Sequence, residues 1–344
     1  MNVAQQLRAA AAERILIKDG AYGTQVQNRR LREADYAGSL GLSRDQKGNN
    51  DLLNLTQPEL VGEICQAFAD AGAELLATNS FNANRISQAD YGAESLVHEI
   101  NVAAARIIAE VCDREAQKDG RKRWTVGALG PTNKTLSLSP NVNDPGYREI
   151  DFDTLSDVYV EQIEGLVEGG AEIILIETVF DTLNAKAAVH AARRVDRDLP
   201  IMLSMTITDL SGRNLSGHSI EAFWASVRHA RPLSIGLNCS FGAAQLRSHV
   251  AVLSGIADTL IMAYPNAGLP NDLGEYDEGP AETAAQVRQW AEQGIVNIVG
   301  GCCGTTPAHI GAIAGAVEGF APRKIAEPRR QTLLAGIEPM VLAA

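Results

Sequence analysis

The chain has 344 residues, 45% of them hydrophobic and 21% charged, with a formal net charge of -12. This composition is that of a folded globular protein, and the negative charge disfavours a broad nucleic-acid-binding surface, which needs clustered Lys and Arg. No stretch approaches the roughly 18 consecutive apolar residues of a membrane span, and the N-terminus lacks the apolar core of a signal peptide. Five cysteines, an odd number, fit a reducing compartment better than a disulfide framework. We therefore expect a cytoplasmic protein that binds neither nucleic acid nor membrane.

Short apolar runs alternate with longer amphipathic segments along the whole chain. The first residues predict a short helix that leads into a strand. Eight runs are continuously apolar, as expected for strands covered on both faces of a parallel sheet: 15–19, 74–79, 125–129, 173–177, 201–206, 235–239, 259–264 and 296–300. Between them the 3.6-residue period predicts helices: 58–71, 99–112, 154–168, 185–194, 220–229, 245–256, 281–293 and 307–317.

Eight strand–helix units over about 320 residues predict a (β/α)8 TIM barrel, whose usual size of about 250 residues grows by loop insertions. The surplus falls in two loops, 23–57 and 130–153. A doubly wound open sheet is the alternative, but no G-x-G-x-x-G follows the first strand. We assign residues 1–325 to the barrel. Residues 326–344, rich in proline and charge, are predicted to form a C-terminal tail or linker.

Polar residues stand where the predicted strands end. In a (β/α)8 barrel the active site forms at the C-terminal ends of the strands. Asp19 ends the first strand and precedes Gly20, Thr78 lies near the end of the second, Glu177 ends the fourth, and Asn266 follows the seventh. Glu177 ends a run of four apolar residues, where an unpaired acid is expensive to bury. For Asp19 a turn or cap role is equally compatible with the local sequence.

Three cysteines share this end of the barrel. Cys239 ends the sixth strand, and Cys302 and Cys303 follow the eighth in the stretch GGCCGTTP. The topology, rather than local spacing, brings their thiols together. The other two cysteines, Cys65 and Cys112, fall inside helix patterns, where a free cysteine acts as a small hydrophobic residue.

Three thiolates suit Zn²⁺ and leave a fourth position for a substrate. A structural zinc site would instead be closed by a fourth Cys or His, commonly with C-x2-C pairs, and no such pair occurs. His309 is the one candidate for that role, but a histidine at a helix start is more often a surface or core residue. A disulfide between Cys302 and Cys303 would close a strained ring, so we interpret it as an oxidised, inactive form.

Several long motifs resemble the homocysteine-binding barrel of zinc-dependent homocysteine methyltransferases, above all the N-terminal module of cobalamin-dependent methionine synthase. They are KGNNDLLNLTQPE, LGPTNKTLSLSPNVNDP, ETVFDTLNAKAA, GLNCSFG, YPNAGLPNDLGEYDE and VNIVGGCCGTTPAHI. The resemblance extends from Arg14 to about Pro322. It implies that Cys239, Cys302 and Cys303 bind Zn²⁺, the same three that the strand ends indicate. Asn266 is a candidate fourth zinc ligand when substrate is absent.

The resemblance implies a homocysteine S-methyltransferase that binds L-homocysteine, activates it as a zinc thiolate and forms methionine, with no catalytic group beyond the zinc-activated thiolate. It assigns Asp19 and Glu177 to the substrate ammonium. Backbone N–H groups of the turn at Gly20 and Ala21, and near Thr78, are candidates for the substrate carboxylate. The methyl donor it implies is methylcobalamin.

No D-x-H-x-x-G, the cobalamin-ligating pattern of that family, occurs in the sequence. Methylcobalamin is therefore expected on a separate protein or module that also binds methyltetrahydrofolate, and the chain is either a separate subunit or an excised module. Two alternatives stay open. One is a self-sufficient methyltransferase that uses betaine or S-methylmethionine, and the other is a non-enzymatic zinc or redox-sensing protein.

Overall fold

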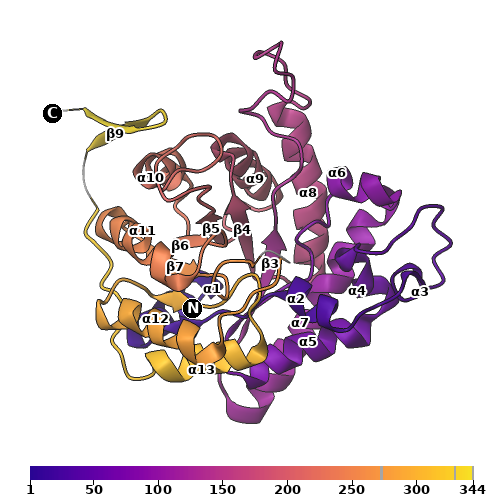
Figure 1. Ribbon diagram of the computed structural model, residues 1–344, viewed down its shortest axis with the longest axis horizontal. Helices are drawn as coiled ribbons and strands as arrows, with labels where there is room; N and C mark the ends of the chain where they lie inside the picture. Colours follow the sequence, from indigo (N-terminus) through magenta and orange to yellow (C-terminus); the bar gives the residue numbers. More distant parts are fainter. Residues whose placement is uncertain (272–273, 329–330, 343–344) are drawn as a thin grey trace.

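The centre of the protein is a parallel sheet of eight strands. The computed structural model describes residues 1–271, 274–328 and 331–342. The strands follow the order β1-β8-β7-β6-β5-β4-β3-β2, and a bridge between Lys18 and Leu75 joins β1 to β2, so that the sheet curls into a barrel (Figure 1). The predicted (β/α)8 barrel is thereby confirmed. The strands are β1 (Leu16–Ile17), β2 (Leu75–Ala77), β3 (Trp124–Leu129), β4 (Ile173–Val179), β5 (Ile201–Met205), β6 (Ser234–Asn238), β7 (Leu260–Tyr264) and β8 (Ile298–Val299).

Helices follow the strands and surround the sheet, as Figure 1 shows. Each of the eight predicted helices is present, with bounds that shift by a few residues at most positions. They are α5 (Pro58–Asp70), α7 (Val97–Asp119), α8 (Phe152–Gly169), α9 (Thr182–Val195), α10 (Ile220–Val227), α11 (Ala243–Ile256), α12 (Pro280–Glu292) and α13 (Pro307–Val317). Glycine in the left-handed conformation ends α8 at Gly170 (φ 108°), as expected where a helix must turn into a strand.

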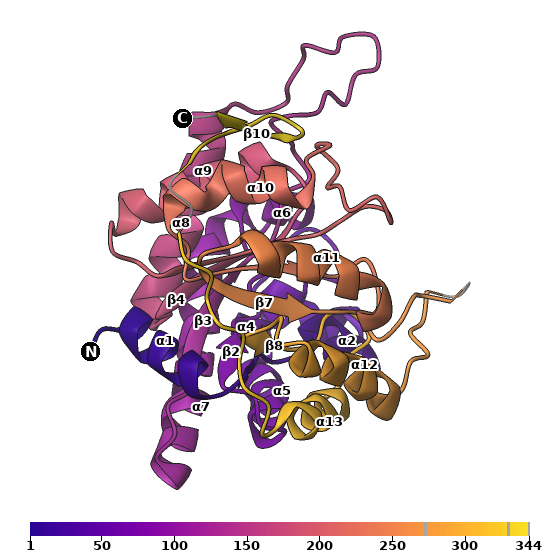
Figure 2. The same ribbon diagram turned by 90° about the vertical axis from the view of Figure 1, so that its left-hand side faces the viewer.

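The apolar core has two layers. One lies between the strands and the surrounding helices. The other fills the barrel itself and includes Leu7 and Ala11 of the N-terminal helix α1 (Val3–Glu13), packed with Trp124 and Ile173 at the starts of β3 and β4. Helix α1 therefore closes the end of the barrel where the strands begin (Figure 2). The opposite end, where the strands finish, is left to the loops.

The two predicted insertions differ in character. Residues 23–57 contain most of α2 (Tyr22–Asn28) and the whole of α3 (Glu33–Ala37) and α4 (Leu53–Thr56). Residues 130–153 form a long loop that extends away from the barrel above α8 (Figure 1), and its side chains Val142 and Tyr147 are exposed. A further short helix, α6 (Arg85–Gln88), follows β2.

The segment predicted to be a tail or linker is docked on the barrel. It contains an antiparallel hairpin of β9 (Thr332–Ala335) and β10 (Pro339–Leu342). Ser219 donates its backbone N–H to Ile337 O at 3.0 Å, and Arg213 forms an ion pair with Glu338. The hairpin thus covers part of the surface around α10. Within the described residues, no helix combines the length and the apolar character needed to cross a membrane.

Candidate metal centre

Three thiols meet at the end of the barrel where the strands finish. Cys239 directly follows β6, and Cys302 and Cys303 lie shortly after β8. Their Sγ atoms all lie within 4.8 Å of one another, with Cys239 at 3.8 Å from Cys303 and Cys302 at 4.0 Å from Cys303. Ligands about 2.3 Å from a tetrahedral zinc ion lie roughly 3.8 Å apart. The spacing therefore fits three corners of a zinc tetrahedron without rearrangement.

The backbone that carries these groups is strained. Of the five non-glycine residues with positive φ in the described part of the chain, three lie here: Thr178 (57°), Cys239 (62°) and Ser240 (63°). This conformation costs about 1–2 kcal/mol per residue. It persists only where surrounding contacts hold it, and here the Phe241 N–H donates to Cys239 O at 2.7 Å.

Glycines around the cysteine pair are required by close packing. A Cβ on Gly301 would lie 2.4 Å from Thr305 Oγ1, and one on Gly304 would lie 2.4 Å from Tyr276 Cβ. Gly304 also has a φ of 79°, which side chains other than glycine rarely adopt. The glycines of GGCCGTTP thus let the loop after β8 pack closely on itself and on the loop after β7 that contains Tyr276. This close packing places the thiols of Cys302 and Cys303 in one cluster.

Asn238, the last residue of β6, contacts the thiol cluster and helps to orient it. Its Nδ2 donates to Cys302 Sγ at 3.8 Å and to Thr178 Oγ1 at 2.9 Å, and its Oδ1 accepts from Ser204 Oγ at 2.6 Å. The buried amide therefore ties β4, β5 and β6 to the Cys302 thiol. Asn238 is a site residue that was not predicted from the sequence, although a polar residue directly before Cys239 in an apolar strand was a usable signal.

Asn266 lies at the rim of the cluster with an unsatisfied oxygen. The residue is buried, and its Oδ1 has no hydrogen-bond partner among the described residues. Its side chain also forms a hydrogen bond with Cys239. A buried carbonyl oxygen without a partner costs free energy, so this atom is suited to a further metal ligand. The sequence-based assignment of Asn266 as a fourth zinc ligand stays a prediction.

The three thiols share negative charge unequally. Hydrogen bonds from Cys302 and Cys303 lower the pKa of Cys239 to about 3. The same contacts raise the pKa of Cys302, and those with Cys239 raise the pKa of Cys303 to about 11. One thiolate is thus stabilised by two thiol donors, and further ionisation is opposed by like charge. A divalent cation would relieve that opposition.

A buried cation lies beneath the cluster. Lys18 Nζ is 2.8 Å from Asp19 Oδ1 and lies 4.7 Å from the centre of the Tyr264 ring. Burial alone would lower the pKa of Lys18, but Asp19 and Glu177 raise it. The Tyr264 hydroxyl donates to Glu177 Oε2 at 2.9 Å. Lys18 and Tyr264 were not predicted as site residues from the sequence, because their contact crosses the barrel from the end of β1 to β7.

Asp19 and Glu177 differ in how much of each carboxylate is free. Asp19 is fully buried, with Oδ1 on Lys18 and Oδ2 accepting the Ala77 N–H at 2.7 Å. Glu177 retains one oxygen beyond its bond with Tyr264. Burial raises the pKa of Glu177, against the opposing effect of Lys18. Lys18, Asp19 and ionised Glu177 together carry a net charge of -1, which suits a cationic ligand group facing Glu177.

The remaining predicted substrate residues line the same end of the barrel. A Cβ on Gly20 would lie 2.8 Å from both the Phe68 ring and Thr305 Oγ1. Ala21 donates its N–H to that same hydroxyl at 3.3 Å. Thr78 is tied into the sheet, because its N–H donates to Val126 O and its hydroxyl accepts from the Ala128 N–H.

His309 and the other two cysteines do not take part in the thiol cluster. Both ring nitrogens of His309 are engaged, Nδ1 with Thr306 at the N-cap of α13 and Nε2 with Glu278 O at 2.9 Å. Cys65 and Cys112 are buried in the core between sheet and helices, and burial raises the pKa of Cys112 to about 12. All five cysteines are free thiols.

The chain matches a known protein family in sequence and several solved structures in fold. The family model described as homocysteine S-methyltransferase matches residues 16–317. Among solved structures, the metallated form of the homocysteine methyltransferase MmuM from Escherichia coli has a TM-score of 0.70 at 20% identity, over 90% of this chain and 98% of that chain. Its oxidized form has a TM-score of 0.69 at 20% identity, over 88% and 95% of the two chains. The carboxyl transferase domain from Rhizobium etli pyruvate carboxylase has a TM-score of 0.51 at 12% identity, over 93% of this chain and 48% of that chain. At these identities the structural matches show a shared fold alone.

Proposed function

Since this chain belongs to the homocysteine S-methyltransferase family, we propose that it binds L-homocysteine at a Zn²⁺ ion held by Cys239, Cys302 and Cys303 and forms methionine. The spacing of the three thiols carries this proposal, because it fits a tetrahedral metal with one corner left for substrate. Asn266, with its unpartnered buried oxygen, is the candidate for that corner before substrate arrives. The metallated form of MmuM is in keeping with a metal in this family.

Bound Zn²⁺ would supply Lewis acidity, which lets a substrate thiol lose its proton near neutral pH, whereas free thiols have a pKa near 8.5. The protein's own residues position the substrate. Glu177 accepts the substrate ammonium with its free oxygen, while Tyr264 holds the other. Asp19 would have to release Lys18 or Ala77 to reach the same ammonium, so we assign it to shaping the pocket. The turn at Gly20 and Ala21 is the candidate for the substrate carboxylate, which would take the Ala21 N–H from Thr305. Thr78 keeps its N–H on Val126 O and shapes the pocket.

Replacing Glu177 with glutamine is expected to weaken homocysteine binding by about 10- to 100-fold, the range for losing a charged hydrogen bond. Zinc content should stay unchanged, because the carboxylate lies in the substrate pocket rather than among the thiols. Titration calorimetry with homocysteine and metal analysis of the same sample measure both. Glu172→Gln, at the residue directly before the same strand and paired with Lys122, is the matched control. Loss of zinc in Glu177→Gln would place Glu177 among the metal ligands and contradict the assignment.

The same variant has a second readout in the stability of the ligand-free protein. Without ligand, Glu177→Gln is expected to resist urea better than the unchanged protein at neutral pH, because burial raises the pKa of Glu177 and disfavours its charge. A carboxyl with a raised folded-state pKa loses its stabilising contribution as the pH rises through that pKa. The advantage of glutamine should therefore grow as the pH rises above about 4.3, the ordinary pKa of a glutamate side chain.

We further propose that the methyl donor is methylcobalamin, carried by a separate protein or module that also binds methyltetrahydrofolate. The long motifs shared with the homocysteine module of cobalamin-dependent methionine synthase support this donor. The loops 23–57 and 130–153 follow β1 and β3, so they flank the end of the barrel where the thiols lie. The exposed side chains Val142 and Tyr147 offer an apolar contact for a transient partner at this end.

Purified protein is expected to form methionine from homocysteine and methylcobalamin, and to form none from homocysteine with betaine or S-methylmethionine. Chromatographic quantification of methionine checks this, with Cys302→Ala as the inactive control. Turnover with a small donor alone would contradict the methylcobalamin proposal and favour a self-sufficient methyltransferase. Tight zinc binding without turnover from any donor would favour a zinc or redox-sensing protein instead.

A further inference from the structure

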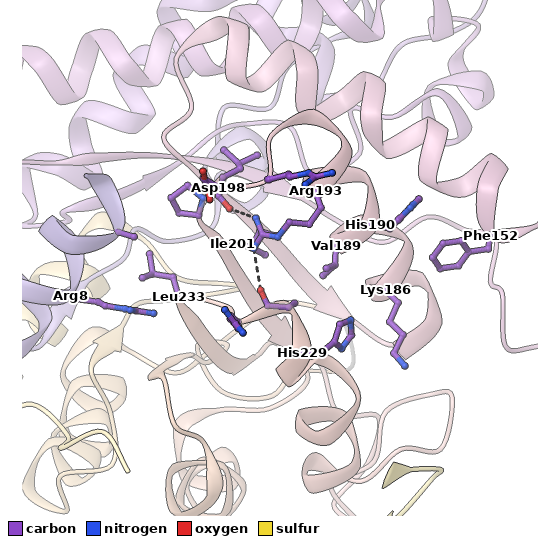
Figure 3. A pocket seen from close by; sticks show the side chains of 16 residues that line it. Arg8, Phe152, Lys186, Val189, His190, Arg193, Asp198, Ile201, His229 and Leu233 are labelled. Carbon is purple, nitrogen blue, oxygen red and sulfur yellow. Dashed lines mark hydrogen bonds between the residues drawn. The ribbon is translucent and has the colours of Figure 1, made fainter. Parts of the chain in front are cut away.

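A pocket of about 750 Å³, drawn in Figure 3, is lined by residues at the starts of the strands. It therefore lies at the end of the barrel opposite the cysteine cluster. It is bounded by α1, by α9 and by the segments that lead into β5 and β6. Ile201 is the first residue of β5, and Leu233 directly precedes β6. Cys239 follows the other end of β6, so the whole length of that strand separates this pocket from the thiols. Its volume is within the roughly 300–1,000 Å³ typical of small-molecule sites.

The charge of this pocket is opposite to that of the protein. The net charge of the chain is -12, yet five of the six Lys, Arg, Asp and Glu residues that line the pocket are basic, and the sixth is Asp198. Two histidines, His190 and His229, also line it. The five basic residues are Arg8, Lys186, Arg193, Arg197 and Arg231.

Four of these cations are left without a partner. The charged groups of Arg8, Lys186, Arg197 and Arg231 make no hydrogen bond or ion pair with another residue in the described ranges. Just outside the pocket, by contrast, Arg194 pairs with Asp157 at 2.6 Å. Gathering like charges around one hollow costs free energy through mutual repulsion. A bound anion would remove that cost.

The floor of the pocket is apolar and held in place. Arg193 donates to Leu199 O at 2.6 Å and to Ala230 O at 3.1 Å, which ties the loop before β5 to the loop before β6 (Figure 3). Between these loops Ile201 and Leu233 are buried. On one side the rings of Phe152 and His190 lie 5.6 Å apart. The pocket thus joins a cationic rim to a rigid apolar base.

We propose that this pocket binds a phosphorylated small molecule, with its phosphate among the unpaired cations and an apolar or aromatic part against Ile201, Leu233 and the Phe152 ring. Guanidinium groups match phosphate oxygens with paired N–H donors, and lysine adds a mobile point charge. Homocysteine, methionine and the proposed methyl donor chemistry need no such group at this end of the barrel. The site is therefore a second one, independent of the thiol cluster.

Titration calorimetry of the full chain at low ionic strength tests the site with two probes, ADP and inorganic pyrophosphate. ADP is expected to bind at one site per chain and more tightly than pyrophosphate, because the apolar floor contributes to the nucleotide alone. The double variant Arg8→Gln/Arg197→Gln should weaken ADP binding by about 10- to 100-fold, the range for losing charged hydrogen bonds. The matched control is Arg106→Gln/Arg247→Gln, which removes the same charge from two exposed helix positions outside the pocket.

Unchanged zinc content and unfolding temperature in both double variants would show that folding is not the cause of the difference. Three results would overturn the proposal. They are absence of saturable ADP binding up to about 1 mM, an equal loss of affinity in the Arg106/Arg247 control, and pyrophosphate binding as tightly as ADP. The second of these would reduce the effect to the general charge of the protein, and the third would remove the role of the apolar floor.

Discussion

A Cys302→Ala variant is expected to bind zinc more than about 100-fold more weakly than the unchanged protein and to form no methionine. Loss of groups that only support a metal ligand already costs about 10- to 100-fold in affinity, and this change removes a ligand itself. The two remaining sulfurs, Cys239 and Cys303, lie 3.8 Å apart and occupy two corners of a tetrahedron that needs three protein ligands. Competition against a chromogenic chelator measures the affinity, and elemental analysis measures the stoichiometry.

Cys65→Ala and Cys112→Ala are the matched controls, because they remove thiols that are buried in the core rather than in the cluster. Both should retain one zinc per chain and lose only the stability expected for a small cavity, about 1–2 kcal/mol. The opposite pattern, with zinc lost in Cys65→Ala and kept in Cys302→Ala, would mean that the metal does not lie at the ends of β6 and β8.

Replacing Lys18 with methionine is expected to lower the free energy of unfolding by about 3–5 kcal/mol, the usual cost of leaving one member of a buried ion pair alone. Asp19 is fully buried, and Lys18 is the cation that contacts its Oδ1. Methionine has a similar length but no charge, so the change removes the pairing with little loss of packing. Urea unfolding followed by circular dichroism measures the effect.

The double variant Lys18→Met/Asp19→Asn should recover most of this loss, because asparagine can still accept the Ala77 N–H without a buried charge. Lys122→Met, which breaks a more exposed pair with Glu172, should cost at most about 1 kcal/mol. A Lys18→Met variant as stable as Lys122→Met, or a double variant that recovers nothing, would show that the buried pair is not what holds this end of the barrel together.

The strands and helices could be predicted from the sequence because apolar runs and helix caps depend on residues close together in the chain. Continuous apolar runs mark strands covered on both faces, and glycine after α8 and before β4 marks a left-handed cap. The differences lie at the ends. Strands β1 and β8 have only two residues each in ladder geometry, although five were predicted for each. Beyond β1 the backbone continues only as an isolated bridge between Lys18 and Leu75, and the Lys18 side chain contacts Asp19 at the site.

The sequence by itself determined the barrel and the three thiols. Eight repeated units dictate which strand ends share a face, and that topology places Cys239 beside Cys302 and Cys303 although they are far apart in the chain. Tertiary structure alone decided which charges pair. Lys18 lies over the Tyr264 ring across the barrel, His309 Nε2 is engaged by Glu278 O, and the cations of the opposite pocket converge from separate segments. Such contacts depend on the directions of side chains from segments that are far apart in sequence. The local hydrophobic pattern does not predict them, because it reports only which face of a helix or strand is buried.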